Sequence, residues 1–226
     1  MDGYVSANQT GDAYTKALKE NNVEIVENFE VSKINNSNNN YEIIDVHGKK
    51  INANKIVLAA GVYLEKILKL VDINIKIKCF PQQLIVTERM PELLKTVITV
   101  AHGKLSLKQF ENGTVLIGGG WPGKGNIENG YNETIPENLI GNMRLACHAI
   151  PNLKNSRVSR VWLGLEAETD DAMPIIGELP NLKNAFIIGS IHSGYTSGPY
   201  MGKLLSEKIL GKDVDLSLFD IRRLMN

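Results

Sequence analysis

The sequence is poor in cysteine and has no excess of charge of either sign. Cys79 and Cys147 are the only two cysteines among 226 residues. They lie far apart with no Cys-x-x-Cys pair, so the spacing indicates neither a zinc site nor a disulfide framework. We interpret them as small buried apolar residues in a reducing compartment. Lysine plus arginine equals aspartate plus glutamate, 25 each, which argues against a nucleic-acid-binding protein, because such proteins normally carry a basic patch.

Long apolar runs are also missing. No run of about 18 apolar residues occurs, so the sequence predicts no membrane-spanning helix. The first residues, MDGYVSANQTGD, lack the basic start and apolar stretch of a signal peptide, and we expect a cytoplasmic protein. Apolar residues still form 43% of the chain, which permits a packed core in one large domain or two small ones.

The periodicity of the apolar residues predicts helices and strands in mixed order. Two short apolar runs, IVLAA at 56–60 and AFIIG at 185–189, are typical of buried strands, and the first suits the middle of a parallel sheet. The β-rich middle between them has the character of an insertion. The predicted helices are 12–22, 62–71, 136–150 and 199–210. The predicted strands are 23–34, 41–46, 50–52, 56–60, 75–79, 83–87, 96–100, 104–110, 114–118, 157–165 and 185–189, with a solvated turn at 35–40 and a hairpin turn at 111–113.

A glycine cluster follows the strand predicted at 114–118. In TVLIGGGWPGKG, Gly118, Gly120 and Gly123 have the spacing of a dinucleotide-binding fingerprint. Such a fingerprint must open a helix, because the helix N-terminus holds the pyrophosphate, and the residues after Gly120 are poor helix formers. A phosphate loop would need Ser or Thr after Lys124, where Gly125 stands. We therefore expect a strand end and a glycine-rich turn; the alternative is a loop that touches a ligand for other reasons.

The most specific motifs lie at 161–211. They are Trp162-x-Gly164, Thr169-x-Asp171-x-x-Pro174-Ile175-Ile176-Gly177, Gly189, His192-Ser193-Gly194 and Gly198-Pro199-x-x-Gly202. In order and spacing they resemble the C-terminal part of the FAD-dependent amino-acid oxidase family, which includes glycine oxidase, sarcosine oxidase, D-amino acid dehydrogenase and proline dehydrogenase. The resemblance covers nearly the whole chain. It does not include the family's own Gly-x-Gly-x-x-Gly, which belongs to an N-terminal strand.

The resemblance implies an α+β fold in which a mixed β-sheet substrate-binding domain is interleaved with part of a Rossmann-like FAD-binding layer. It divides the chain into four segments. They are 1–55 (start of the substrate domain and FAD-side strands), 56–72 (strand and helix of the FAD layer), 73–165 (substrate-binding mixed sheet with a helix) and 166–226 (C-terminal FAD-binding strand, loop and helix). It implies FAD as cofactor, and a further N-terminal FAD-binding segment or partner subunit that completes the protein.

The resemblance also assigns residues to the cofactor. Small residues let backbone approach a flat ring closely, and a helix N-terminus stabilises negative charge on a reduced ring. The expected FAD-binding residues are Val31, Ala59, Ala60, Gly61, Gly189, His192, Ser193, Gly194, Tyr195, Thr196, Ser197 and Gly198. Pro199 fits the first turn of the helix that follows. For each, ordinary packing or a plain strand–loop–helix connection is the alternative.

For the substrate, the resemblance implies a small amino acid or amine whose C–N bond is oxidised by hydride transfer to FAD. That chemistry depends on positioning, so no catalytic residue is assigned. Many relatives have arginine where Glu166 stands, and Glu166 would repel a carboxylate or face an ammonium group. The other substrate candidates are Trp162, His102 and Tyr195. We expect an enzyme that is inactive as this chain alone. A non-catalytic subunit or interaction module of the same fold, or a flavin enzyme for 2-hydroxy acids or glycerol phosphate, remains open.

Overall fold

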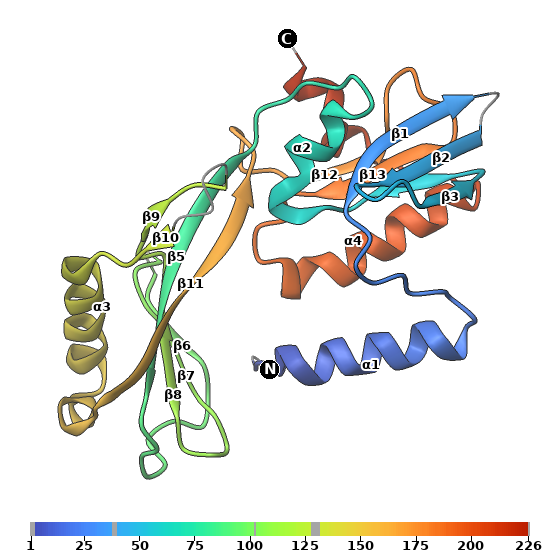
Figure 1. Ribbon diagram of the computed structural model, residues 1–226. Helices are drawn as coiled ribbons and strands as arrows, with labels where there is room; N and C mark the ends of the chain where they lie inside the picture. Colours follow the sequence, from blue (N-terminus) through green and yellow to red (C-terminus); the bar gives the residue numbers. More distant parts are fainter. Residues whose placement is uncertain (1–2, 38–39, 102, 128–131, 226) are drawn as a thin grey trace. The chain divides into compact units, whose positions relative to one another are not determined.

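The computed structural model describes residues 3–37, 40–101, 103–127 and 132–225 (Figure 1). They form two compact units. The first unit comprises Met1–Glu27 and Pro81–Gly164, and the second comprises Asn28–Phe80 and Leu165–Asn226. These boundaries differ from the segments expected at 55 and 72, and the assignment of segments to cofactor and substrate stays a prediction.

The first unit contains a five-stranded sheet in the order β11-β5-β8-β7-β6. Its helix α3 begins with Pro136, whose missing N–H costs nothing at that position. Its β7–β8 hairpin turns at Gly113, where φ is +87°. The elements are α1 (Ala7–Glu20), β5 (Lys78–Thr87), β6 (Ile98–Thr99), β7 (Ser106–Gln109), β8 (Val115–Gly118), β9 (Lys124–Gly125), β10 (Asn132–Glu133), α3 (Pro136–Ala149), η2 (Pro151–Asn155) and β11 (Val158–Glu168). β5 and β11 continue into the second unit.

The second unit is built on a three-stranded sheet in the order β12-β13-β4. A second, antiparallel sheet in the order β1-β2-β3 belongs to the same unit. The elements are β1 (Val31–Ser37), β2 (Asn40–Asp45), β3 (Lys50–Ala53), β4 (Ile56–Leu58), η1 (Gly61–Tyr63), α2 (Leu64–Lys69), β12 (Ile175–Glu178), β13 (Ala185–Gly189), α4 (Gly194–Ile209), η3 (Ser217–Phe219) and η4 (Ile221–Leu224). In Figure 1 the β1–β3 sheet and α4 lie on opposite sides of β12 and β13.

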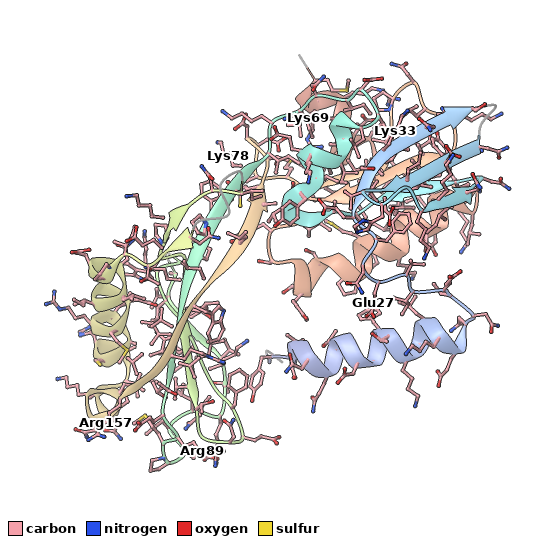
Figure 2. All side chains as sticks on the ribbon, in the orientation of Figure 1. Glu27, Lys33, Lys69, Lys78, Arg89 and Arg157 are labelled. Carbon is pink, nitrogen blue, oxygen red and sulfur yellow. The ribbon has the colours of Figure 1, made fainter. Side chains whose placement is uncertain are left out.

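Strand β13 explains this layering. Its side chains alternate between two cores, as the period of a strand requires. Ala185 and Ile187 enter the core shared with the β1–β3 sheet and α2, whereas Phe186 packs with Leu205 of α4. A run that is apolar on both faces is therefore buried on both faces. Charged side chains such as those of Lys33 and Lys69 extend outward (Figure 2).

The structure confirms the predicted α+β class. The sheet β12-β13-β4 is mixed, whereas the pairs β5–β8, β8–β7 and β7–β6 of the five-stranded sheet are antiparallel. The strand predicted at 23–34 is wrong for its first half. Residues 23–30 are irregular and pair with no described strand, and Val23 and Ile25 are exposed. The turn predicted at 35–40 is also partly wrong, since 35–37 belong to β1. The strands predicted at 75–79 and 83–87 are one strand, β5.

One prediction next to the candidate site needs correction, and another stays a prediction. Within the described residues β4 lies at an edge of its sheet. Among the described strands it pairs only with β13, and Val57 is 44% exposed. An apolar sequence carries no information on how many strands flank it. Helix α4 begins at Gly194 rather than near Pro199, so Pro199 lies inside the helix. The small residues and serine before Pro199 show no helical periodicity, so the sequence pattern places the start of the helix at the proline.

Candidate functional site

The candidate site lies where β4 and β13 end. These strands pair in parallel, Ile56 with Ala185 and Leu58 with Ile187, so their carboxyl ends meet at one edge of the sheet. In open α/β sheets, ligands bind outside the carboxyl ends of the strands. Ala59–Gly61 follows β4, and the loop Ser190–Ser193 followed by α4 comes after β13. The topology therefore brings together two of the segments that the sequence assigned to a cofactor.

Close packing joins these two segments. A Cβ atom added to Gly189 would lie 2.5 Å from Cδ2 of Leu64, so the first residue of α2 occupies the space beside the end of β13. Gly61 has a φ of +55°, and a Cβ atom there would meet nothing within 4 Å. Gly61 is thus needed for the turn out of β4, whereas Gly189 is needed for packing. Ala60 and Val31 are half-buried against the same core, so Val31 has a packing role whatever else it does.

The loop between β13 and α4 is conformationally unusual. Ser190 and Ser193 have φ values of +49° and +56°, the left-handed region that few non-glycine residues adopt. Such residues concentrate at binding and active sites. Ser193 is the N-cap of α4, but its side chain makes no capping hydrogen bond. The positive end of the 16-residue helix α4 thus opens at this loop, in the arrangement that favours an anion or an electron-rich group.

Ser190 carries a second signal. Its side chain is only 5% exposed, and its Oγ atom has no hydrogen-bond partner among the described residues. A buried hydroxyl without a partner costs about 1–3 kcal/mol, so native structures rarely keep one without a reason. A polar ligand group at the end of β13 would remove that penalty. Sequence reasoning missed Ser190, although a serine directly after the apolar strand AFIIG was a usable signal.

Glu166 and His192 form a polar pair in the second unit. Nδ1 of His192 lies 2.9 Å from Oε1 of Glu166, and their side chains are 62% and 33% exposed. The pair connects the loop after β13 to β11. An imidazole N–H donated to a carboxylate fixes the orientation of both groups. The free oxygen of this carboxylate is then suited to bind an ammonium group. Sequence reasoning named both residues but gave no sign of their contact.

The remaining candidates are distributed unevenly. Every residue expected to bind the cofactor belongs to the second unit. Five of them, Gly194–Gly198, lie in the first turns of α4 rather than in a loop, and Tyr195 is 58% exposed. Trp162 belongs to the first unit, where its ring lies 5.0 Å from the guanidinium carbon of Arg160. His102 lies outside the described residues.

The glycine cluster after β8 is a structural turn, as predicted. Gly119 and Gly120 have positive φ values, and a Cβ atom at Gly119 would collide with the backbone of Leu105. The indole Nε1 of Trp121 donates a hydrogen bond of 2.7 Å to the carbonyl oxygen of Lys104. In the described residues that follow, up to 127, the chain forms the short strand β9 and no helix. The spacing of a fingerprint is present without the helix that it requires.

The Thr169-x-Asp171 motif has a structural role as well. Asp171 accepts a hydrogen bond of 2.7 Å from Nε of Arg223, which belongs to the C-terminal turn η4. Thr169 Oγ1 donates to the backbone oxygen of Met173 at 2.7 Å. The Arg223 guanidinium holds the pKa of the Asp171 carboxyl well below its usual value, against the opposing effect of burial. The motif therefore holds the turn before β12 to the end of the chain.

The described residues offer no metal site. They contain no cluster of three or more His, Cys, Asp and Glu side chains suitable for a metal ion. Within the same ranges, every helix is too short or too polar to cross a lipid bilayer. Cys79 and Cys147 are both free thiols.

Comparison with known proteins gives consistent matches. The family model described as FAD dependent oxidoreductase matches residues 1–208. Hydrogen cyanide synthase subunit HcnC of Pseudomonas protegens is 29% identical over 222 residues, 94% of this chain and 51% of that protein. Glycine oxidase from Geobacillus kaustophilus superposes with a TM-score of 0.83 at 19% identity, over 95% of this chain and 57% of that one. L-proline dehydrogenase from P. horikoshii superposes with a TM-score of 0.81 at 25% identity, over 94% of this chain and 58% of that one. The chain spans about half the length of the curated relatives it matches.

Proposed function

The chain belongs to the family of FAD dependent oxidoreductases, and we propose that it is the C-terminal part of an enzyme that oxidises the C–N bond of a small amino acid or N-methyl amino acid. FAD is the cofactor of this family, and it supplies the acceptor for the hydride that leaves the substrate carbon. The observation that supports this proposal most directly is the edge of the sheet where β4, β13 and the start of α4 meet.

The residues at this edge fit FAD. The buried hydroxyl of Ser190 has no partner among the described residues, and a polar edge of the cofactor would satisfy it. The N-terminus of α4 offers backbone N–H groups and a positive dipole end to the electron-rich part of the flavin. The residues that would hold the cofactor are those expected from the sequence, Val31, Ala59–Gly61, Gly189 and His192–Gly198, together with Ser190.

Glu166 would determine which substrates bind. Its carboxylate, oriented by His192 at 2.9 Å, attracts the ammonium group of an amino acid and repels a second carboxylate. The ammonium group must first release one proton to solvent, because the hydride leaves from the carbon beside a neutral amine. An amine that is held in place presents its α-carbon in one orientation, and positioning of this kind supplies much of the catalysis in a hydride transfer. Tyr195, Trp162 and His102 remain weaker candidates for substrate contact.

We further propose that this chain is inactive alone and works with a further FAD-binding segment or a partner subunit. It spans about half of HcnC, which is itself named as a subunit. The edge of β4, where Val57 is 44% exposed, would accommodate additional structure. Two free thiols suit a reducing cytoplasm, where we place the assembled enzyme.

The test is to express the chain alone and together with the sequence encoded immediately upstream. The combined protein should be yellow with a flavin absorbance spectrum, and the chain alone should be colourless. Anaerobic addition of sarcosine, glycine or proline should bleach the flavin. If the combined protein stays colourless, the chain is better explained as a non-catalytic subunit. If only 2-hydroxyglutarate or glycerol phosphate bleaches the flavin, the enzyme oxidises an alcohol and not an amine.

A further inference from the structure

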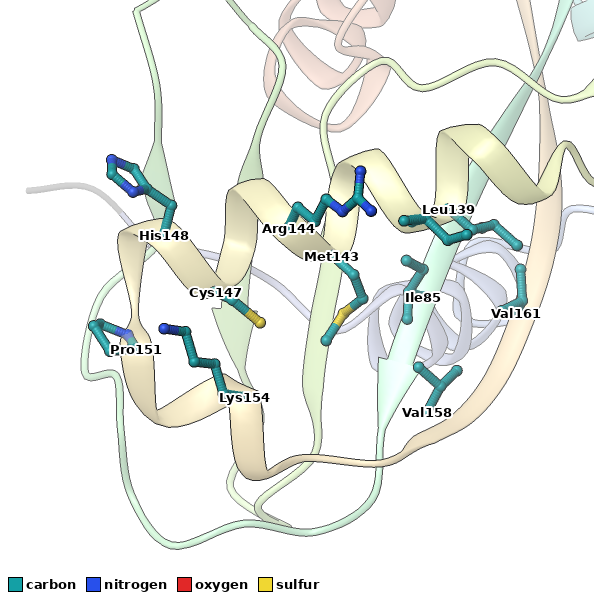
Figure 3. Close-up of a pocket in the computed structure, with 11 residues that line it drawn as sticks. Ile85, Leu139, Met143, Arg144, Cys147, His148, Pro151, Lys154, Val158 and Val161 are labelled. Atoms are coloured by element: carbon teal, nitrogen blue, oxygen red, sulfur yellow. The ribbon is translucent and has the colours of Figure 1, made fainter.

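An apolar groove with basic residues lies in the first unit, and none of its lining residues takes part in the proposed oxidation. It runs between α3, η2 and the strands β5 and β11, and its volume is about 820 Å³ (Figure 3). Small-molecule sites typically have volumes of about 300–1,000 Å³. The groove is therefore large enough to hold most of a small organic ligand.

The walls of the groove are mainly aliphatic. Ile85 of β5 is 1% exposed and belongs to the core of the unit, whereas Ile140 of α3 and Val158 of β11 are 51% and 48% exposed. Figure 3 shows Met143 and Cys147 pointing from α3 toward the strands. The exposed aliphatic side chains of Ile140 and Val158 therefore border the core of the unit at this groove.

The polar side chains of the groove are all basic. Arg144 and His148 are four residues apart on α3 and so lie on the same side of the helix. Lys154 joins them from η2. Among the described residues, no side-chain hydrogen bond or ion pair joins any of the three to a partner, and the groove lining contains no aspartate or glutamate. The groove therefore combines an apolar wall with positive charge that has no counter-ion within the described chain.

We propose that this groove binds a single-chain amphipathic carboxylate, such as a medium-chain fatty acid. The aliphatic chain would lie against Ile140, Val158 and Val161, and the carboxylate would lie between Arg144 and Lys154. A planar guanidinium matches the two oxygens of a carboxylate, and burial of the aliphatic chain provides the hydrophobic part of the affinity. The proposal does not depend on flavin binding.

Cys147 provides the readout, because it lines the groove and is a free thiol. With Cys79→Ser in the full chain, Cys147 is the only thiol left to react with a maleimide. Dodecanoate, added below its micelle-forming concentration, should slow the alkylation of Cys147 to a saturable limit. Dodecanol, which has the same chain without the charge, should protect at least tenfold more weakly.

The charge requirement is tested with the double variant Arg144→Gln/Lys154→Gln. Both side chains are exposed, so the fold should persist, and circular dichroism checks it. The double variant should bind dodecanoate at least tenfold more weakly. The control variant Lys16→Gln/Lys19→Gln removes the same charge from α1, outside the groove. This control should bind dodecanoate as tightly as the parent does.

Three results would overturn the proposal. They are no saturable protection by dodecanoate, equal protection by dodecanol, and unchanged binding in the Arg144→Gln/Lys154→Gln variant. Sedimentation adds a further check. The chain could form a dimer in which Cys147 is protected from alkylation without any ligand. If Ile140→Asp then dissociates that dimer, a second copy of the chain covers the groove instead of a fatty acid.

Discussion

Nδ1 of His192 lies 2.9 Å from Oε1 of Glu166, so a polar contact links the loop before α4 to β11. The two residues were expected to have different roles. His192, in the loop, was expected to bind the cofactor, and Glu166, in the strand, was expected to contact the substrate. Glu166 is 33% exposed, enough for one carboxylate oxygen to reach a ligand. The pair therefore provides a direct test of how substrates are selected.

Replacement of Glu166 by glutamine should impair amine oxidation in the assembled enzyme. The amide has nearly the same shape but cannot neutralise an ammonium group, and hydrogen bonds to charged groups contribute about 1.5–3 kcal/mol. We expect kcat/KM for the best amine substrate to fall at least tenfold, as measured by steady-state turnover. The flavin content, measured by absorbance, should not change.

The matched control for this variant is Glu168→Gln. Glu168 ends the same strand, β11, and the change removes the same charge. It should leave kcat/KM within about twofold of the parent. His192→Asn should have an intermediate effect, since Glu166 keeps its charge but loses the group that orients it. Equal activity of Glu166→Gln and the parent would remove Glu166 from the site.

Ser190→Ala should separate stability from cofactor binding. The variant removes a buried hydroxyl that has no partner among the described residues, so the free energy of unfolding without cofactor should stay the same or rise by about 1 kcal/mol. FAD affinity should fall about fivefold, because a net hydrogen bond contributes about 1 kcal/mol. Urea denaturation measures the first quantity, and flavin fluorescence titration of the assembled protein measures the second.

Ser206→Ala is the control for Ser190. Ser206 lies further along α4, and its hydroxyl donates to the backbone oxygen of Lys203 on the exposed side of the helix. This variant should bind FAD as the parent does. If Ser190→Ala destabilises the chain and leaves FAD affinity unchanged, the Ser190 hydroxyl has a structural partner and the cofactor lies elsewhere.

The parts of the fold that could be predicted are those with strong local signals. β13 was predicted with its observed bounds, since five apolar residues lie between turn residues. α3 was predicted to within one residue, because Pro136 and Pro151 limit it on either side. α4 was misplaced at its start, where glycine, serine and threonine conceal the helical period.

The site itself could be predicted only in part. The residues of the loop after β13 were found through a resemblance and not through periodicity. The contact of Glu166 with His192 depends on how β11 packs in the second unit, which no local pattern encodes. The left-handed backbone and burial of Ser190 are likewise imposed by tertiary structure, because serine has no intrinsic preference for that conformation.

The Asp171–Arg223 ion pair should make stability depend on pH in the acid range. Arg223 lowers the pKa of Asp171 in the folded protein, so the stabilisation is fully present above the unfolded-state pKa of about 3.9. It is lost as the pH falls below that value toward the folded-state pKa. Since Asp171 is 36% exposed, we expect only about 1–2 kcal/mol from the pair.

Asp171→Asn should therefore unfold in urea with a free energy lower by that amount at pH 7, and the difference from the parent should shrink as the pH approaches 3. Asp170→Asn is the control, because Asp170 pairs with Lys78 at the surface and should change stability little at pH 7. A constant difference between Asp171→Asn and the parent from pH 7 to pH 3 would show that the loss comes from the hydrogen bonds that Oδ1 of Asp171 accepts from Thr169 and Met173 and not from the charge of the carboxylate.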